Sequence, residues 1–274
     1  MHYIKKLLLS FTTMFCCLIA FAQDSTSSSK KNVLAASVNY QSKLHFFGRV
    51  DSLESSGLFP SIGFELKNGL YATSNFIFIH NSIQKTEYTG TTIEAGYRFP
   101  ESEHFTGNVF YTHFLYKDNS ELVQSALKGQ TGINAAYTNK IVNLNFGADL
   151  KFSDKTDIGA TFGLDHLFLQ KLQDKMALAF NPSAYLYAGT QQFSNTYVKN
   201  IASPLPGFPG TGQTVTEQVK AFNILAYEFS APIVFVAGKF NASITPSYVL
   251  PQQLIPGENG KNLFYISLGI GVRL

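Results

Sequence analysis

The last stretch of the chain, Leu263 to Leu274, reads LFYISLGIGVRL. Its even-numbered positions are all apolar, and the residues between them are mostly small or polar. This two-residue period predicts a β-strand with one apolar and one polar face. The stretch has 12 residues, whereas strands of soluble proteins commonly have ~5–6 and a tilted strand that crosses a bilayer needs ~9–11. We therefore expect it to span a membrane.

A long alternating strand at the end of a chain resembles the C-terminal strand of Gram-negative outer-membrane β-barrels. That resemblance implies that the strand is recognised by the outer-membrane assembly machinery and closes the barrel. Those proteins usually end in Phe or another aromatic residue, whereas this chain ends in Leu274. The resemblance covers the architecture and indicates no specific functional family.

The N-terminal segment has the parts of a secretory signal peptide. Lys5 and Lys6 precede an apolar run, and residues 20–22 (Ala-Phe-Ala) form a small-x-small cleavage site. We expect residues 1–22 to be a signal peptide and the protein to be exported. Gln23 after this site resembles the start of exported proteins of Bacteroidota. The alternative is an N-terminal membrane anchor, but the apolar run is shorter than the ~20 residues that a spanning helix needs.

Composition narrows the class of the mature protein. Cleavage would remove both cysteines, Cys16 and Cys17, and with them any disulfide or cysteine metal site. It would also remove two of the 21 basic residues, leaving 19 against 18 acidic ones, so nucleic-acid binding is not indicated. No later segment approaches 18 consecutive apolar residues, which excludes helical membrane spans. Apolar residues in alternation, with many Phe and Tyr, predict an all-β fold, a transmembrane antiparallel up-and-down β-barrel.

The chain divides into a flexible polar leader at 23–32 and the barrel at 33–274. We expect about twelve strands, near 33–47, 58–67, 70–80, 88–99, 104–116, 125–138, 141–152, 156–168, 175–189, 220–236, 240–250 and 263–274. The connections alternate between short and mostly longer ones, as periplasmic turns and extracellular loops do. A polar connection is expected after 156–168. A soluble β-sandwich, the main alternative, has no reason to alternate in this way.

The longest connection, residues 190–219, is rich in proline and glycine. Loops of this length are commonly functional or disordered. Two interpretations remain open: a loop folded into the barrel mouth, as in porins, or a mobile surface loop. A hairpin within it would raise the strand count to fourteen.

Alternation also assigns faces to the strands. In 141–152, Phe146 and Leu150 are expected to face lipid, while Asp149 and Lys151 face the lumen. Pro182 and Pro232 lack a ladder donor and predict local distortions. The expected lumen-lining residues are Glu65, Lys67, Glu94, Arg98, Asp149, Lys151, Asp165, Glu228 and Arg273. Such mixed charges predict either a polar pore lining or an internal ion-pair network in a narrow, partly occluded barrel.

His80 and Ser82 form a His-x-Ser pair at a strand end. This pair resembles the catalytic residues of outer-membrane lipases and lipid A deacylases, in which histidine acts as base for the serine. Glu87, Thr89 or Glu94 could supply the third group. The match has only three residues, so an ordinary polar loop edge is the simpler interpretation. No residue spacing predicts a metal site or a cofactor.

Three functions follow as hypotheses. The first is a passive channel or uptake pore for small polar solutes, in contact with outer-membrane lipid and lipopolysaccharide. The second is a surface lipid hydrolase that uses His80 and Ser82, although an enzyme is the less expected outcome. The third is a non-conducting structural or adhesive barrel whose loop 190–219 meets a partner.

Overall fold

The computed structural model describes residues 31–50, 53–83, 85–100, 102–117, 127–190, 196–200, 212–216, 222–252 and 261–274. The expected signal peptide, most of the leader and most of the connection 190–219 lie outside these residues. No helix in the described part of the chain is long and apolar enough to cross a membrane.

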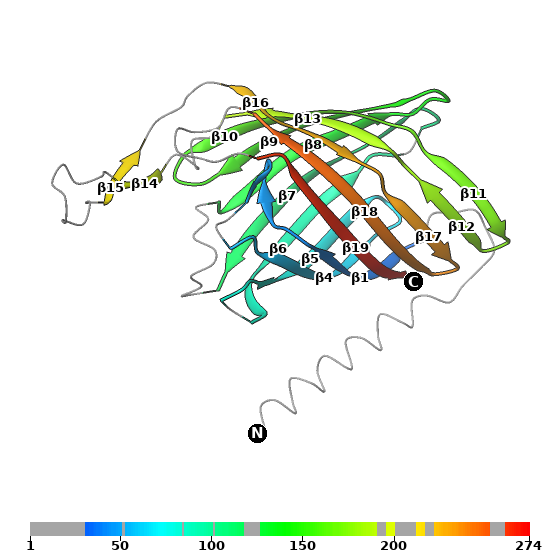
Figure 1. Ribbon diagram of the computed structural model, residues 1–274. Coiled ribbons are helices and arrows are strands. Elements are labelled where there is room, and N and C mark those ends of the chain that lie inside the picture. Colours follow the sequence, from blue (N-terminus) through cyan, green and yellow to red (C-terminus); the bar gives the residue numbers. More distant parts are fainter. Residues whose placement is uncertain are drawn as a thin grey trace.

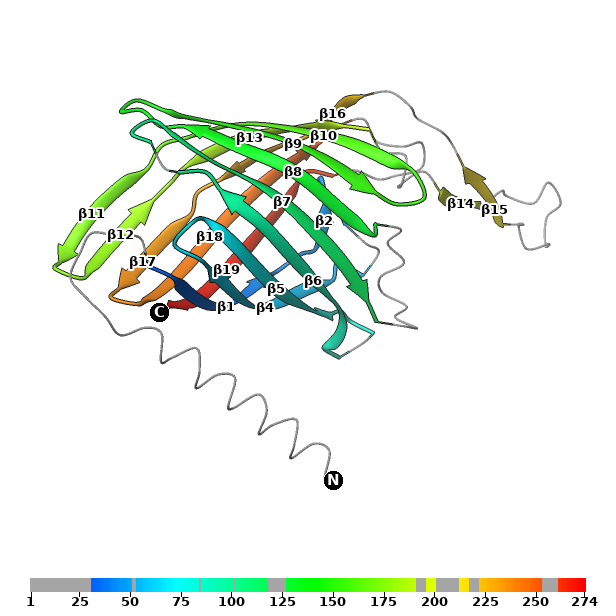
Figure 2. The same ribbon diagram turned by 180° about the vertical axis from the view of Figure 1, so that it is seen from behind.

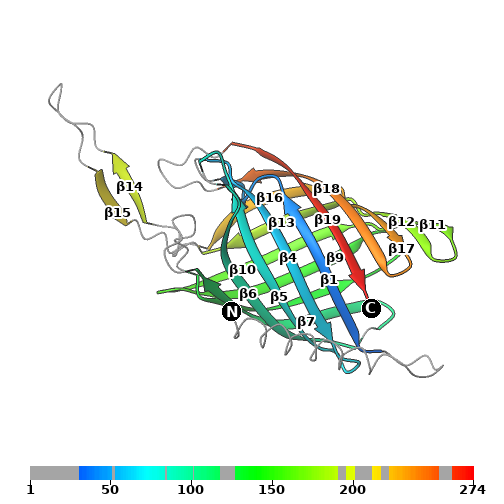
Figure 3. The ribbon, with the colours of Figure 1, turned by 90° about the horizontal axis from the view of Figure 1, so that it is seen from below.

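Twelve strands form one closed wall, and each pairs antiparallel with its neighbours. They are β1 (Val33–Gln41), β4 (Ser56–Glu65), β5 (Leu70–His80), β6 (Glu87–Arg98), β7 (Phe105–Tyr116), β8 (Gly129–Tyr137), β9 (Asn143–Phe152), β10 (Thr156–Asp165), β13 (Ser183–Gly189), β16 (Asn223–Ser230), β18 (Phe240–Pro251) and β19 (Leu263–Arg273). The last strand, β19, pairs with both β18 and β1, so it closes the wall (Figure 3). Closure satisfies the backbone donors and acceptors of the wall without water, as a membrane span requires. The predicted all-β barrel of twelve strands is confirmed.

Three strands continue past a break into shorter segments. These segments are β11 (Phe168–Gln173), β12 (Met176–Phe180) and β17 (Ile233–Ala237), and they extend from one end of the wall (Figure 1). Pro182 and Pro232 lie at two of the breaks, where the Asn181 amide donates to the Pro232 carbonyl at 3.0 Å. The distortions predicted at both prolines are confirmed. The expected polar connection after 156–168 is wrong, because residues 168–173 pair with β12 instead.

Connection lengths distinguish the two ends of the barrel. At one end, here the turn end, the connections are 66–69, 99–104, 138–142, 174–175 and 238–239. At the other, the loop end, they are 42–55, 81–86, 117–128, 153–155, 190–222 and 252–262. The predicted alternation is confirmed in part: the connections 42–55, 117–128, 190–222 and 252–262 are longer than any turn, whereas 153–155 is short and 81–86 is as long as the turn 99–104. The first strand ends at Gln41 and not at residue 47, because the chain turns inward there, as described below.

A hairpin does lie within the long connection, but it adds nothing to the wall. Its strands β14 (Thr196–Asn200) and β15 (Gly212–Thr216) form a separate two-stranded sheet. Figure 1 shows this hairpin away from the wall strands. The barrel therefore keeps twelve strands.

The outer surface of the wall is apolar. Phe146 is 49% exposed and Leu150 is 39% exposed on the face opposite to Asp149. At the turn end, outward rings meet in pairs: Tyr97 and Phe99 have centroids 6.0 Å apart, and Phe105 and Tyr137 have centroids 5.1 Å apart. In a chain without tryptophan, such Phe and Tyr rings are the side chains from which an interfacial aromatic girdle can be built. Figure 2 shows the tilted wall strands β5, β6 and β7 side by side.

Candidate functional site: the barrel lumen

The connection 42–55 turns into the barrel at its loop end. Its short strands β2 (His45–Phe46) and β3 (Arg49–Val50) pair as a hairpin. An ion pair of 2.6 Å between Lys43 and Glu54 closes the base of this hairpin. The Ser42 amide donates to the Ile266 carbonyl, and the Ile266 amide donates to Ser42 Oγ, each at 2.9 Å. These bonds continue the pairing of β1 with β19 by one residue, with the Ser42 side chain accepting one of the two hydrogen bonds.

The hairpin packs against the inner wall through two aromatic contacts. The centroid of His45 lies 4.6 Å from that of Tyr265, and the centroid of Phe47 lies 5.5 Å from that of Tyr187. Phe47 has φ of 51°, a strained conformation for a bulky residue that persists only where surrounding contacts fix it. The buried cluster beneath contains Ala226, Val249, Leu263 and Tyr265. The hairpin therefore fills part of the lumen at the loop end.

Sequence reasoning assigned this inward role to the connection 190–219 as one option and did not consider residues 42–55. A signal was present, because the aromatic run His45–Phe46–Phe47 precedes a glycine in a segment that no longer alternates. A run of rings in a connection indicates that the segment packs against something.

Glu228 is the charged group beneath the hairpin. Tyr265 Oη donates to Glu228 Oε1 at 2.6 Å. Burial lowers the pKa of His45, while the nearby negative charge of Glu228 acts in the opposite direction and is the weaker effect. The docked hairpin therefore favours a neutral imidazole.

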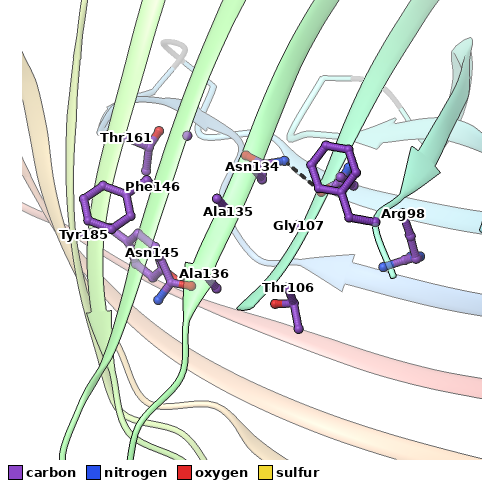
Figure 4. A pocket seen from close by; sticks show the side chains of 13 residues that line it. Arg98, Thr106, Gly107, Asn134, Ala135, Ala136, Asn145, Phe146, Thr161 and Tyr185 are labelled. Atoms are coloured by element: carbon purple, nitrogen blue, oxygen red, sulfur yellow. Dashed lines mark hydrogen bonds between the residues drawn. The ribbon is translucent and has the colours of Figure 1, made fainter. Parts of the chain in front are cut away.

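A cavity of about 480 Å³ lies in the lumen toward the turn end. The residues that line it are Arg98, Phe99, Thr106, Gly107, Asn108, Asn134, Ala135, Ala136, Asn145, Phe146, Gly147, Thr161 and Tyr185, of which Phe99 and Phe146 have exposed rings on the outer face of the wall. Figure 4 shows Tyr185, Asn145 and Thr161 on one side of it, Arg98 on the other, and Asn134 between them. Asn134 and Asn108 are register partners on β8 and β7, and Asn134 Nδ2 donates to Asn108 Oδ1 at 3.4 Å.

Beside this cavity, Glu94 organises a group of neutral partners. Tyr71 Oη donates to one carboxylate oxygen at 3.0 Å, and Thr112 Oγ1 donates to the other at 2.9 Å. Asn108 Nδ2 in turn donates to Tyr71 Oη at 3.0 Å. A carboxylate inside the barrel thus has its hydrogen bonds supplied by the wall.

The remaining charged residues of the lumen are mostly paired. At the turn end, Arg98 Nε lies 3.1 Å and Arg273 Nη2 3.9 Å from the Glu65 carboxylate. Nearer the loop end, Lys151 pairs with Asp149 on the same strand. In such pairs the opposite charges balance each other, so the pairs add no net charge to the lumen.

Two further members of the expected lining have different surroundings. Asp165 accepts hydrogen bonds from the side-chain amides of Asn143 and Asn145. Lys67 lies in the turn 66–69, outside the wall strands, with its backbone amide bonded to Asn32. The expected lining thus divides into several small groups around the inner wall.

The predicted pair His80 and Ser82 lies at the loop end of the barrel, and it stays a prediction. Both are exposed at the loop end, whereas Ile79 and Asn81, beside them in the chain, are each 6% exposed. No hydrogen bond joins His80 to Ser82 within the described residues. The suggested third group Glu87 instead accepts a hydrogen bond from Lys117 at 2.7 Å. The described residues also contain no group of three or more His, Cys, Asp or Glu side chains that could hold a metal ion.

Aromatic rings in the lumen lie over glycines of the neighbouring strand. Tyr71 lies over Gly96, where an added Cβ would be 2.6 Å from the ring, and Tyr185 lies against Gly163 in the same way. Glycine allows a ring to lie close to a strongly curved sheet. The sequence did not predict these pairs, because which residue of a neighbouring strand lies opposite each ring depends on the strand register.

A closed antiparallel wall with an apolar exterior and a polar lumen defines a transmembrane β-barrel of the outer-membrane class. The sequence matches no protein-family model and no curated protein. Among solved structures the chain resembles the NanC porin, with 10% identity over 88% of this chain and 100% of that chain and a TM-score of 0.49. It also resembles the KdgM porin, with 8% identity over 87% of this chain and 98% of that chain and a TM-score of 0.47. A third resemblance is to LpxR from Salmonella typhimurium, with 11% identity over 88% of this chain and 99% of that chain and a TM-score of 0.48. Likeness at this level carries no argument about function.

Proposed function

We propose that this protein is an outer-membrane channel through which small polar solutes pass. The supporting observation is the polar cavity of about 480 Å³ inside a closed wall whose outer surface is apolar. A barrel that served only as a scaffold could fill this space with side chains, as eight-stranded barrels do. The hairpin at the loop end narrows the path, so the channel would admit small solutes only.

Several expectations from the sequence belong to the same proposal. The protein is exported with cleavage after residue 22, is inserted by the outer-membrane assembly machinery, and contacts lipid and lipopolysaccharide. In this proposal the charged residues predicted from the sequence form the lumen lining, except Lys67, which lies in the turn 66–69. Asp149 and Lys151 lie on one strand within this lining.

The test is the conductance of the refolded mature protein in a planar bilayer. Discrete, stable current steps are expected, and a double variant Asp149→Asn/Lys151→Met should change their size because both charges of the lining are lost. Insertion verified by protease protection, without any current, would refute the channel. An unchanged current in the double variant would remove that pair from the lining.

The two other functions from the sequence remain predictions with their own tests. Lipid hydrolysis by His80 and Ser82 predicts that purified barrel releases fatty acid and that Ser82→Ala stops it. Adhesion through the connection 190–219 predicts that deletion of this connection abolishes surface binding. No contact of a described residue favours either over the channel.

A further inference from the structure

The cavity in the lumen is polar but almost uncharged. Of the thirteen residues that line it, Arg98 alone carries a charge, and its guanidinium is balanced by Glu65 at 3.1 Å. Its other polar side chains are asparagine, threonine and tyrosine. A site built for an anion would present unpaired cations, and a site built for a cation would present carboxylates. The cavity fits a neutral solute instead.

Several of these side chains have hydrogen-bonding capacity to spare. Asn134 donates to Asn108, but within the described residues its Oδ1 accepts no hydrogen bond. Within the same residues, Thr161 Oγ1 and Tyr185 Oη make none. Amides and hydroxyls can both donate and accept. A ligand with several neighbouring hydroxyl groups, each of which can donate and accept a hydrogen bond, would use this capacity fully.

Tyr185 adds a flat apolar surface to the same cavity. Its ring lies against Gly163 on one side and is nearly parallel to the ring of Tyr187, with 18° between the planes and 6.2 Å between the centroids. Aromatic faces carry partial negative charge and attract the partially positive hydrogens of a neighbouring group. A saturated ring with C–H groups on its face can therefore pack against Tyr185 while its rim reaches the asparagines.

We propose that this cavity is a binding site for a neutral sugar ring. The sugar hydroxyls bond to the side chains of Asn134, Asn145 and Thr161, and a C–H face of the ring packs on Tyr185. The cavity volume of about 480 Å³ lies within the range of about 300–1,000 Å³ that small-molecule sites have. The site deepens the proposed channel function and rests on it, because a sugar reaches the lumen by entering the pore.

The first test is block of the ionic current by raffinose, a neutral trisaccharide. Raffinose should interrupt the current saturably, whereas a polyethylene glycol of equal hydrodynamic size should not. Asn134→Leu keeps the side-chain size without its hydrogen bonds and should weaken the block by about threefold to tenfold. The matched control is Asn39→Leu, a lumen asparagine on β1 at the opposite wall, which should leave the block unchanged. Equal block by the polymer, or an unchanged block in Asn134→Leu, would overturn the sugar site.

The second test does not need a current and so separates the two proposals. Saturation-transfer NMR with raffinose and the folded barrel in detergent should show transfer to the sugar C–H groups, reduced in both Asn134→Leu and Tyr185→Leu. Heat-dependent migration in gel electrophoresis verifies that each variant is folded. Transfer without any current would refute the channel and keep the site. A current without transfer or block would keep the channel and refute the site.

Discussion

Tyr265 on β19 donates a hydrogen bond of 2.6 Å to Glu228 on β16, across the intervening strand β18. The ring of the same tyrosine supports His45 of the inward hairpin. One side chain of the final strand thus joins a carboxylate of the wall to the segment that narrows the mouth. The stability of the wall and the width of the lumen therefore depend on a common contact.

Tyr265→Phe should destabilise the folded barrel. The substitution removes a short hydrogen bond to a partly buried carboxylate, for which a loss of about 1–3 kcal/mol is typical. Urea unfolding in lipid vesicles measures this loss. Tyr248→Phe on β18 is the control, because Tyr248 is 41% exposed on the outer face and should change the free energy of unfolding little. Equal losses in both variants would contradict the role of Glu228.

Replacement of residues 43–54 by a short Gly-Ser linker should enlarge the current steps. The hairpin contacts Tyr187 and Tyr265 inside the mouth, so its removal widens the path at the loop end. Single-channel conductance in a planar bilayer measures the change. A barrel that stays folded but shows an unchanged conductance would mean that the narrowest part of the path lies elsewhere.

Acidification should release the hairpin, because burial lowers the pKa of His45 below its ordinary value of 6.5. Glu228 from β16 and the neutral Tyr265 from β19 face the ring, and the carboxylate only partly offsets burial. An undocked hairpin titrates near 6.5 and takes up the proton first. Docking is therefore fully stable above this pH and weakens as the pH falls through 6.5 toward the lower pKa of the docked state.

Conductance measured from about pH 8 to about pH 5 should accordingly rise on the acidic side of about 6.5. His45→Phe keeps an aromatic ring without the titration and should make the profile flat in this range. His104→Phe is the matched control, since His104 lies in the turn 99–104 at the other end of the barrel. A rise that survives in His45→Phe would assign the pH dependence to another group.

The two-residue period of apolar residues was sufficient to predict most of the fold from the sequence. The period indicates where strands lie, so the strand number and the opposite faces of Phe146 and Asp149 could be predicted from it. The closing role of β19 was implied by the resemblance of this strand to the C-terminal strands of outer-membrane β-barrels. The inward turn at Ser42 could not, because it depends on bonds to Ile266, more than two hundred residues away. No face was predicted for Asn134 or Tyr185, and which inward residues share a cavity depends on how rings such as Tyr185 lie over glycines.

Gly163→Ala should destabilise the wall beside the cavity. A Cβ at this position would overlap the ring of Tyr185, which has to leave its place. Overpacking of this kind costs about 1–3 kcal/mol. Urea unfolding measures the cost, and the double variant Gly163→Ala/Tyr185→Ser should lose less than the sum of its single variants, because the overlap is gone. Strict additivity would show that the two residues do not interact.

Glu65→Gln should shift the channel toward anions. Arg98 lies 3.1 Å and Arg273 3.9 Å from this carboxylate, so its removal leaves two cations at the turn end without their shared partner. The reversal potential across a salt gradient measures the shift, which should be larger at low ionic strength because salt screens exposed charges. Lys67→Gln is the control, since Lys67 lies in the turn 66–69 and should change selectivity less. An unchanged reversal potential in Glu65→Gln would place the Glu65 group outside the conducting path.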